Sequence, residues 1–174
     1  MEVKNDNLKE VFSKAYDDFG DAIFRYCKFQ TSNHELALDL TADTFTKTWE
    51  YLSSGKEVDN LRAFLYRVAN NLIIDYRRKK KSDSLDAITE AGFDIKDEND
   101  EKIMHENAFE GKMAMEAVQK LDENYRDVLI MRFVEDMSVK EISKILNEKE
   151  NNISVRIHRA LEKLKNLLSE NKEN

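Results

Sequence analysis

Apolar residues recur at helical spacing in three segments of the N-terminal half. The first segment, residues 8–29, is interrupted by Gly20, which predicts a broken helix or two short helices. The second segment ends at residues 53–55, and one face is expected to be core: it carries Leu38, Thr41, Phe45, Thr48, Trp49 and Leu52. The third segment has the clearest buried stripe, formed by Leu61, Phe64, Leu65, Val68, Leu72, Ile73 and Tyr76.

The opposite face of the second segment combines charged side chains with leucines. Its charged residues are Asp39, Asp43, Lys47 and Glu50. Leu36 and Leu40 point the same way, although a solvated surface does not need them. Leucines beside an acidic stripe therefore predict contact with a partner protein.

The polar arc of the third segment has the chemistry of a nucleic-acid surface. It consists of Tyr66, Arg67, Asn70, Asn71, Arg77 and Arg78, followed by three lysines. Bases can stack on rings, amides can read base edges and cations neutralise phosphates, which suits single-stranded nucleic acid. A solvated basic helix end is the alternative, because cations also favour a helix C-terminus.

The C-terminal part predicts a helix-turn-helix preceded by two further helices. Residues 113–133 hold the two helices, with Asp122 as the N-cap between them. Ser138 and Glu141 have the spacing of a capping box, which opens a short helix before a final one. The buried stripe of the final helix is expected to be Ile153, Ile157, Ala160, Leu161 and Leu164.

The opposite arc of the final helix could enter a major groove. Its members are Asn152, Val155, Arg156, Arg159 and Lys163. Arg can bind guanine bidentately and Asn can pair with adenine, while Lys163 suits a phosphate. Helical pairs of this polarity also occur in ordinary bundles.

Composition and charge favour an all-α fold of two small domains. The chain has 41% hydrophobic and 36% charged residues, four Gly and no Pro. This composition favours long solvated helices over a turn-rich β fold. Residues 62–81 hold seven basic residues and one acidic, whereas residues 82–110 hold two basic and ten acidic. Because residues 82–110 also lose apolar periodicity, we predict helical domains at 1–81 and 111–174 joined by an acidic flexible linker at 82–110.

Several function classes are not expected from these residues. The apolar runs are far shorter than the roughly 20 residues that span a bilayer, so no membrane insertion is expected. The N-terminus lacks the apolar core of a secretory signal, and the single Cys27 cannot form an internal disulfide, so a cytoplasmic location is expected. Neither Cys27 nor the three histidines have spacing for a metal site or a nucleophile and base, so no enzyme, metal or cofactor is expected.

Three stretches, in order, resemble bacterial RNA polymerase sigma factors of the extracytoplasmic-function group (group IV). They are HELALDLTADTFTKTWEYL, LRAFLYRVANNLIIDYRRKK and LDENYRDVLIMRFVEDMSVKEISKILNEKENNISVRIHRALEKLK. The resemblance covers most of the chain. It implies sigma regions 2 and 4, and an alternative sigma factor that binds core polymerase and directs promoter-specific transcription initiation.

The resemblance also implies a role for each segment. The second helix would dock on the polymerase clamp through Leu36, Asp39, Leu40, Asp43 and Phe45, and the polymerase flap and an anti-sigma factor are further candidate partners. The third helix would recognise and melt the minus-ten element, with Asn71 helping to hold an extruded base at a cost of a few kcal/mol of stacking. The final helix would read the minus-thirty-five element, and the acidic linker would run through the RNA exit path.

Some positions depart from the family pattern, so promoter sequence is not carried over. The departures are Asn70, Glu148, Lys149, Asn151 and Ser154. A stand-alone helix-turn-helix regulator and a helical adaptor remain alternatives, although the arc at residues 66–81 argues against both. Because the net charge is −7, we expect the isolated chain to bind promoters weakly, with the polymerase supplying most of the nonspecific affinity.

Overall fold

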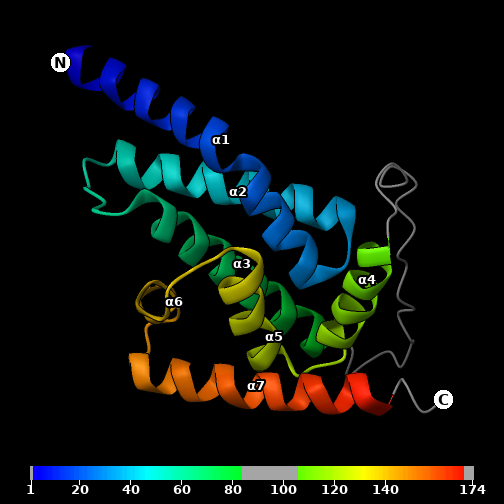
Figure 1. Cartoon of the computed structure of the whole chain (residues 1–174). Coiled ribbons are helices and arrows are strands. Elements are labelled where there is room, and N and C mark those ends of the chain that lie inside the picture. Colours follow the sequence, from blue (N-terminus) through cyan, green and yellow to red (C-terminus); the bar gives the residue numbers. More distant parts are fainter. Residues whose placement is uncertain (1, 84–105, 171–174) are drawn as a thin grey trace. The chain divides into compact units, whose positions relative to one another are not determined.

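The computed structural model describes residues 2–83 and 106–170, which form helices joined by short turns, with no β-strand among them (Figure 1). The predicted all-α fold is confirmed. The chain divides into unit 1, residues 1–94, and unit 2, residues 95–174. Most of the predicted linker lies outside the described residues. No helix in these ranges is both long enough and apolar enough to cross a bilayer.

Unit 1 consists of α1 (Glu2–Thr31), α2 (His34–Ser53) and α3 (Leu61–Asp83), and α2 lies between the other two (Figure 1). The predicted break at Gly20 is wrong, because α1 is continuous. A glycine inside a helix costs about 1 kcal/mol relative to alanine. Ala15 and Ile23 are buried on either side of Gly20, and their packing holds the helix together across it.

The buried face of α2 differs from the predicted one. It consists of Ala37, Leu40, Thr41, Thr44, Phe45 and Thr48. Leu38 was expected in the core but is 45% exposed, whereas Leu40 was expected outside and is 5% exposed. The physical reason is that α2 packs against α1 on one side and α3 on the other, which turns a wider arc inward than a single stripe requires.

Three buried threonines on α2 are compatible with this core because their hydroxyls are satisfied within the helix. Thr41, Thr44 and Thr48 each donate a hydrogen bond to the carbonyl oxygen four residues earlier, at 2.6, 2.6 and 2.8 Å. The helix begins where the Asn33 side chain accepts a hydrogen bond from the Leu36 N–H at 2.9 Å. Local capping and internal hydroxyl bonds thus allow polar residues on a helix buried from two sides.

Unit 2 consists of α4 (Glu106–Gln119), α5 (Glu123–Leu129), a π-helical turn η1 (Ile130–Val134), α6 (Val139–Leu146) and α7 (Glu150–Glu170). The predicted capping box is confirmed: Ser138 Oγ accepts from the Glu141 N–H at 3.2 Å, and Glu141 Oε2 accepts from the Ser138 N–H at 2.9 Å. Asp122 is the N-cap residue of α5, as predicted, but its side chain makes no capping hydrogen bond.

The turn between α6 and α7 completes a helix-turn-helix. Asn147 adopts a left-handed backbone conformation with φ +54°, which ends α6. The Lys149 carbonyl then accepts hydrogen bonds from the backbone N–H groups of Asn152 and Ile153 in the first turn of α7. Ile153 and Ala160 of α7 are buried, but Leu161 is 40% exposed, so its predicted burial is wrong. It lies at the border of the arc that faces the rest of unit 2.

Candidate functional site

The predicted partner face of α2 is split between surface and core. Asp39 and Asp43 are exposed and Leu36 is half-buried, whereas Leu40 and Phe45 are buried. The expected exposure of Leu40 is therefore wrong, whereas Phe45, although largely buried, lines a groove between α1 and α2. Leu40 can therefore only support the face through packing.

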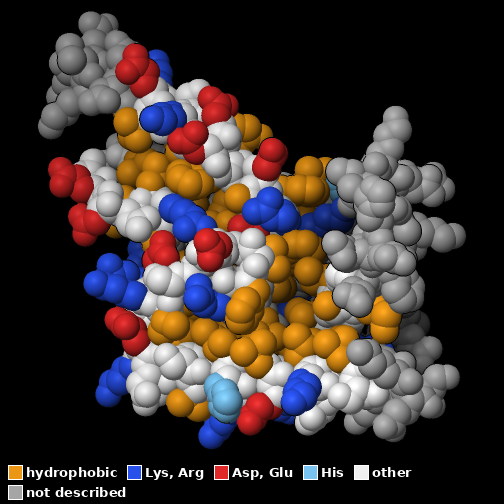
Figure 2. All heavy atoms as spheres, in the orientation of Figure 1, with side chains coloured by type: hydrophobic (Ala, Val, Ile, Leu, Met, Phe, Trp, Pro, Cys, Tyr) orange, Lys and Arg blue, Asp and Glu red, His pale blue; other side chains and the backbone are white. Residues whose placement is uncertain are grey.

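A groove between α1 and α2, of about 1310 Å³, lies beside this acidic face. Phe12 and Tyr16 line it from α1, and Leu38 and Trp49 line it from α2. Phe12 packs edge-on against Trp49, with ring centroids 5.0 Å apart, while Tyr16 is 55% exposed. Figure 2 shows hydrophobic side chains exposed between the charged side chains of α1 and α2.

Sequence periodicity does not find this groove, because Tyr16 and Leu38 fall in phase with residues expected in the core. The available signal is the width of the apolar arc on α1. Val11 and Tyr16 are both exposed although they belong to an apolar segment. When the apolar arc of a helix is wider than the face that the core covers, the remaining apolar side chains are exposed and available to a partner.

Two of the six residues of the predicted nucleic-acid arc of α3 lie in the core. Tyr66 and Asn70 are buried, contrary to their expected exposure. Tyr26 Oη donates a hydrogen bond to Asn70 Oδ1 at 3.2 Å, and the Tyr26 and Tyr66 rings meet edge-on at 5.2 Å. The reason is again that α3 packs against two helices, so polar residues fill part of its inner arc.

The Arg77 side chain also forms hydrogen bonds within unit 1 rather than extending into solvent. Its Nη2 donates to the Gln30 side-chain oxygen at 2.7 Å and to the Gln30 backbone oxygen at 3.2 Å. Gln30 is buried near the C-terminal end of α1. Arg77 therefore links the ends of α1 and α3.

The exposed members of the α3 arc are Arg67, Asn71 and Arg78, followed by the lysines at 79–81. Arg67 lies over the Phe64 ring at 5.2 Å, and Lys56 lies over the Tyr51 ring at 4.8 Å. Tyr51 and Phe64 are in contact, with ring centroids 4.7 Å apart. Arg67 and Lys56 thus each lie over one ring of a contacting aromatic pair, close to the start of α3. The sequence alone does not single out Tyr51 or Lys56.

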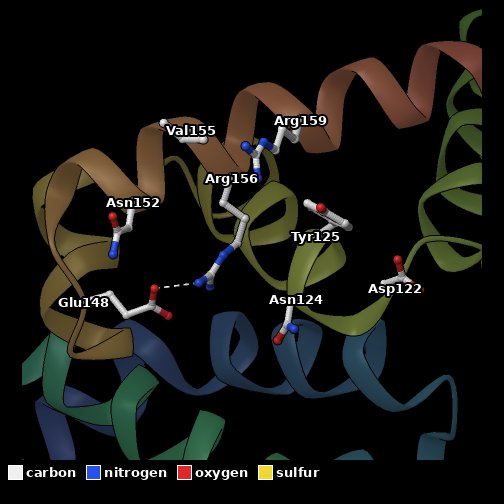
Figure 3. Close-up of a pocket in the computed structure, with 8 residues that line it drawn as sticks. All are labelled: Asp122, Asn124, Tyr125, Glu148, Asn152, Val155, Arg156 and Arg159. Carbon is white, nitrogen blue, oxygen red and sulfur yellow. Dashed lines mark hydrogen bonds and ion pairs between the residues drawn. The ribbon is translucent and has the colours of Figure 1, made fainter.

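On α7, the predicted DNA arc keeps Asn152, Val155 and Arg159 exposed (Figure 3). Arg156 is half-buried and forms an ion pair with Glu148 of the turn. A pocket of about 580 Å³ lies between the start of α5, the turn and α7, and all five of these residues line it.

Lys163, the last member of this arc, lies against the start of α5. Its Nζ is 3.8 Å from Asp122 Oδ2 and 5.1 Å from the centre of the Tyr125 ring. Lys163 therefore already has an acid and an aromatic ring as neighbours within unit 2, which reduces the charge it offers to a phosphate.

The cysteine has the character of a core residue. Burial raises the pKa of the Cys27 thiol from 9.0 to about 12, while a side-chain hydrogen bond with Thr41 acts in the opposite direction. The thiol is therefore protonated at neutral pH. Across the described ranges, no group of three or more His, Cys, Asp or Glu side chains is placed to hold a metal ion.

The two units define a DNA-binding protein built from two helical modules, one with a basic helix beside paired rings and one with a helix-turn-helix. Residues 15–82 match the family model Sigma-70 region 2, and residues 112–164 match Sigma-70, region 4. The chain belongs to the extracytoplasmic-function group of RNA polymerase sigma factors. It binds core RNA polymerase and promoter DNA and directs promoter-specific transcription initiation. Sigma factors in general are non-catalytic regulatory proteins.

Similar proteins span nearly the whole chain. The sigma factor SigW of Bacillus subtilis is 29% identical over 168 residues, covering 92% of this chain and 90% of SigW. YlaC of the same organism is 25% identical over 169 residues, covering 97% and 95%. The solved structure of the sigma factor RpoE in complex with the anti-sigma factor NepR, from Bartonella quintana, has the same fold, with a TM-score of 0.78, 21% identity and coverage of 92% and 98%.

Proposed function

We propose that the chain divides promoter recognition between its units, with unit 1 binding the polymerase clamp and the minus-ten element and unit 2 reading the minus-thirty-five element. The observation that carries this proposal is that exposed basic and amide side chains occur on α3 and on α7, in two separate compact units. Phosphate neutralisation dominates unaided DNA binding, and this chain has a net charge of −7. Localised recognition within a polymerase complex suits that charge.

The groove between α1 and α2 is the proposed polymerase-docking surface. Its exposed apolar side chains, Tyr16 and Leu38, line it together with Asp39, and Asp43 is exposed one helical turn further along α2. An apolar centre with a polar rim is the usual anatomy of a protein interface. Half-buried Leu36 and the groove-lining Phe45 stay in the proposed contact set, whereas buried Leu40 is proposed to act only through packing.

The first half of α3 is the proposed minus-ten site. Asn71 is exposed and its amide can hydrogen-bond an extruded base, while Arg67 lies over the Phe64 ring nearby in the helix. Extruding a base costs a few kcal/mol, which the hydrogen bonds and ionic contacts of this site must offset. The basic run at residues 78–81 can neutralise phosphates, and the buried contacts of Asn70 and Tyr66 hold the helix rigid.

The exposed face of α7 is the proposed minus-thirty-five site. Asn152 can pair with adenine, Val155 can contact a thymine methyl group and Arg159 can bind guanine bidentately. All three side chains are exposed on one side of the helix. The flap of the polymerase would hold unit 2 at this element.

We also propose that an anti-sigma factor covers the groove between α1 and α2 when the chain is inactive. The fold match to a sigma factor solved with the anti-sigma factor NepR supports this idea. Such a cover would exclude the polymerase directly. The proposed location is the cytoplasm, where the polymerase acts, and the chain itself is proposed to catalyse no reaction.

The division of labour can be tested with Asn71→Ala and Arg159→Ala in holoenzyme, on a promoter selected by run-off transcription. Recruitment is measured by anisotropy of labelled promoter DNA, and opening by permanganate reactivity of thymines. We expect Asn71→Ala to reduce opening about tenfold with little change in recruitment. Arg159→Ala should reduce recruitment about tenfold, since one bidentate base contact contributes about 1–3 kcal/mol.

Lys165→Ala is the matched control, because it removes an exposed cation from α7 outside the proposed DNA arc. It should leave both steps close to the unmodified protein. Equal defects at both steps for Asn71→Ala and Arg159→Ala would refute the division of labour.

A further inference from the structure

Two of the three basic side chains on the proposed DNA arc of α7 face acids of the same unit. Arg156 Nη2 is 2.5 Å from Glu148 Oε2, and Lys163 Nζ is 3.8 Å from Asp122 Oδ2. For Arg159, no ion pair is found within the described part of the chain. The arc therefore presents less positive charge than its sequence suggests.

The Arg156–Glu148 pair is built by the fold rather than by helical periodicity. Glu148 lies in the turn, eight positions before Arg156, and its backbone N–H donates to the Ser143 carbonyl at 2.9 Å, which fixes the turn. Figure 3 shows the two side chains extending toward each other from the turn and from α7. The Arg156 side chain is 25% exposed and the Glu148 side chain is 30% exposed, so solvent screens this pair less than a fully exposed pair.

The pair uses only a small part of the guanidinium. Arginine has five N–H donors in a planar fork, and among residues 2–83 and 106–170 Arg156 makes one hydrogen bond, to Glu148. The pocket beside it is open and also lined by Asn152 and Arg159. Arg156 can therefore keep its carboxylate partner and still offer donors to a base edge.

We propose that Glu148 is a specificity-determining residue that holds Arg156 away from the phosphate backbone. This inference rests on the proposed function, in which α7 faces duplex DNA. A guanidinium paired with a carboxylate carries little net charge and attracts a phosphate only weakly. Binding to random-sequence DNA, which depends on phosphate contacts, therefore lacks the contact that Arg156 would otherwise make. A base edge needs directed donors rather than net charge, so binding at the correct sequence is reduced less.

The test measures binding of the full-length chain to a fluorescent random-sequence duplex of about 30 base pairs while salt is varied. Glu148→Gln should release Arg156 and add about one phosphate contact, which steepens the slope of log affinity against log salt by about 0.9. Between about 200 mM and about 50 mM salt, this slope predicts an additional affinity gain of roughly 3.5-fold over the unmodified chain.

Glu150→Gln is the matched control, because Glu150 is an exposed acid in the first turn of α7 and its loss changes the net charge equally. It should leave the slope unchanged. In an Arg156→Gln background, Glu148→Gln should have no effect on the slope, because the released side chain is absent. Circular dichroism melts of each variant verify folding.

The inference is overturned if Glu148→Gln and Glu150→Gln change the slope equally, since that is a net-charge effect alone. It is also overturned if Glu148→Gln steepens the slope in the Arg156→Gln background. A third contradicting result is that Glu148→Gln gains no affinity over the unmodified chain at the lowest salt. Failure of the proposed function is seen separately, as unchanged promoter recruitment in Arg159→Ala holoenzyme.

Discussion

Leu38 and Leu40 lie two residues apart on α2, and truncating each to alanine separates core packing from partner binding. Leu40 is 5% exposed in the core of unit 1, whereas Leu38 is 45% exposed in the groove between α1 and α2. The same chemical change at the two positions therefore has different physical consequences. Leu40→Ala tests the core, and Leu38→Ala tests the docking surface.

The magnitudes follow from burial. Truncating a buried leucine loses its transfer free energy and leaves a cavity, which together cost about 3–5 kcal/mol of unfolding free energy. Leu40 belongs to this class, because α2 is packed between two helices. Leu38 loses only part of its contact area, so Leu38→Ala should cost less than about 1 kcal/mol.

Trp49 provides the assay, because it is the single tryptophan of the chain and belongs to unit 1. Its fluorescence during urea denaturation of the full-length chain reports unfolding of that unit. With an m-value of about 1–2 kcal/mol/M, Leu40→Ala should lower the midpoint by about 1.5 M or more, and Leu38→Ala should shift it by less than about 1 M. Leu38→Ala should instead weaken binding to core polymerase about tenfold, measured by anisotropy of the labelled chain.

Two results would refute this reasoning. Equal losses of stability in the two variants would mean that the burial difference between the leucines is wrong. Unchanged polymerase binding by Leu38→Ala would remove the groove as the docking surface, even if the stabilities came out as expected.

Further predictions concern the interior of unit 1. Asn70→Ala removes the buried hydrogen bond with Tyr26 and should cost about 1–3 kcal/mol in the same urea titration, whereas Asn71→Ala, at an exposed position, should stay within about 0.5 kcal/mol. A larger loss from Asn71→Ala would contradict the assignment of these two asparagines. The Cys27 thiol has a raised pKa in the folded chain, so its contribution to stability is intact below pH 9.0 and falls as pH rises toward about 12. Cys27→Ala should therefore lose less stability than the unmodified chain between pH 9.0 and about pH 10, and parallel losses would contradict this.

The features predicted well from sequence depend on neighbours along the chain. The capping box of Ser138 and Glu141 needs only a three-residue spacing, and the structure forms both of its hydrogen bonds. The existence of the helices depends in the same way on local periodicity. The break expected at Gly20 failed because packing on both sides overrides the modest local cost of a glycine.

The burial of individual side chains could not be predicted, because it depends on how many helices cover each face. A single apolar stripe describes a helix covered on one side, but α2 and α3 are each packed by two helices of unit 1. Leu40, Tyr66 and Asn70 were therefore expected at the surface and lie in the core. The pair of Glu148 and Arg156 depends on a turn whose geometry no periodic pattern encodes.

The central claim is that two helical units recognise separate promoter elements and that core polymerase makes this recognition productive. The most direct test is run-off transcription from a promoter library by purified bacterial core polymerase, with and without the protein, followed by start-site mapping. We predict start sites that require the protein and lie downstream of a two-part motif, with only weak promoter binding by the protein alone. Tight, sequence-specific binding by the free protein at moderate salt, with no dependent start sites, would contradict the claim.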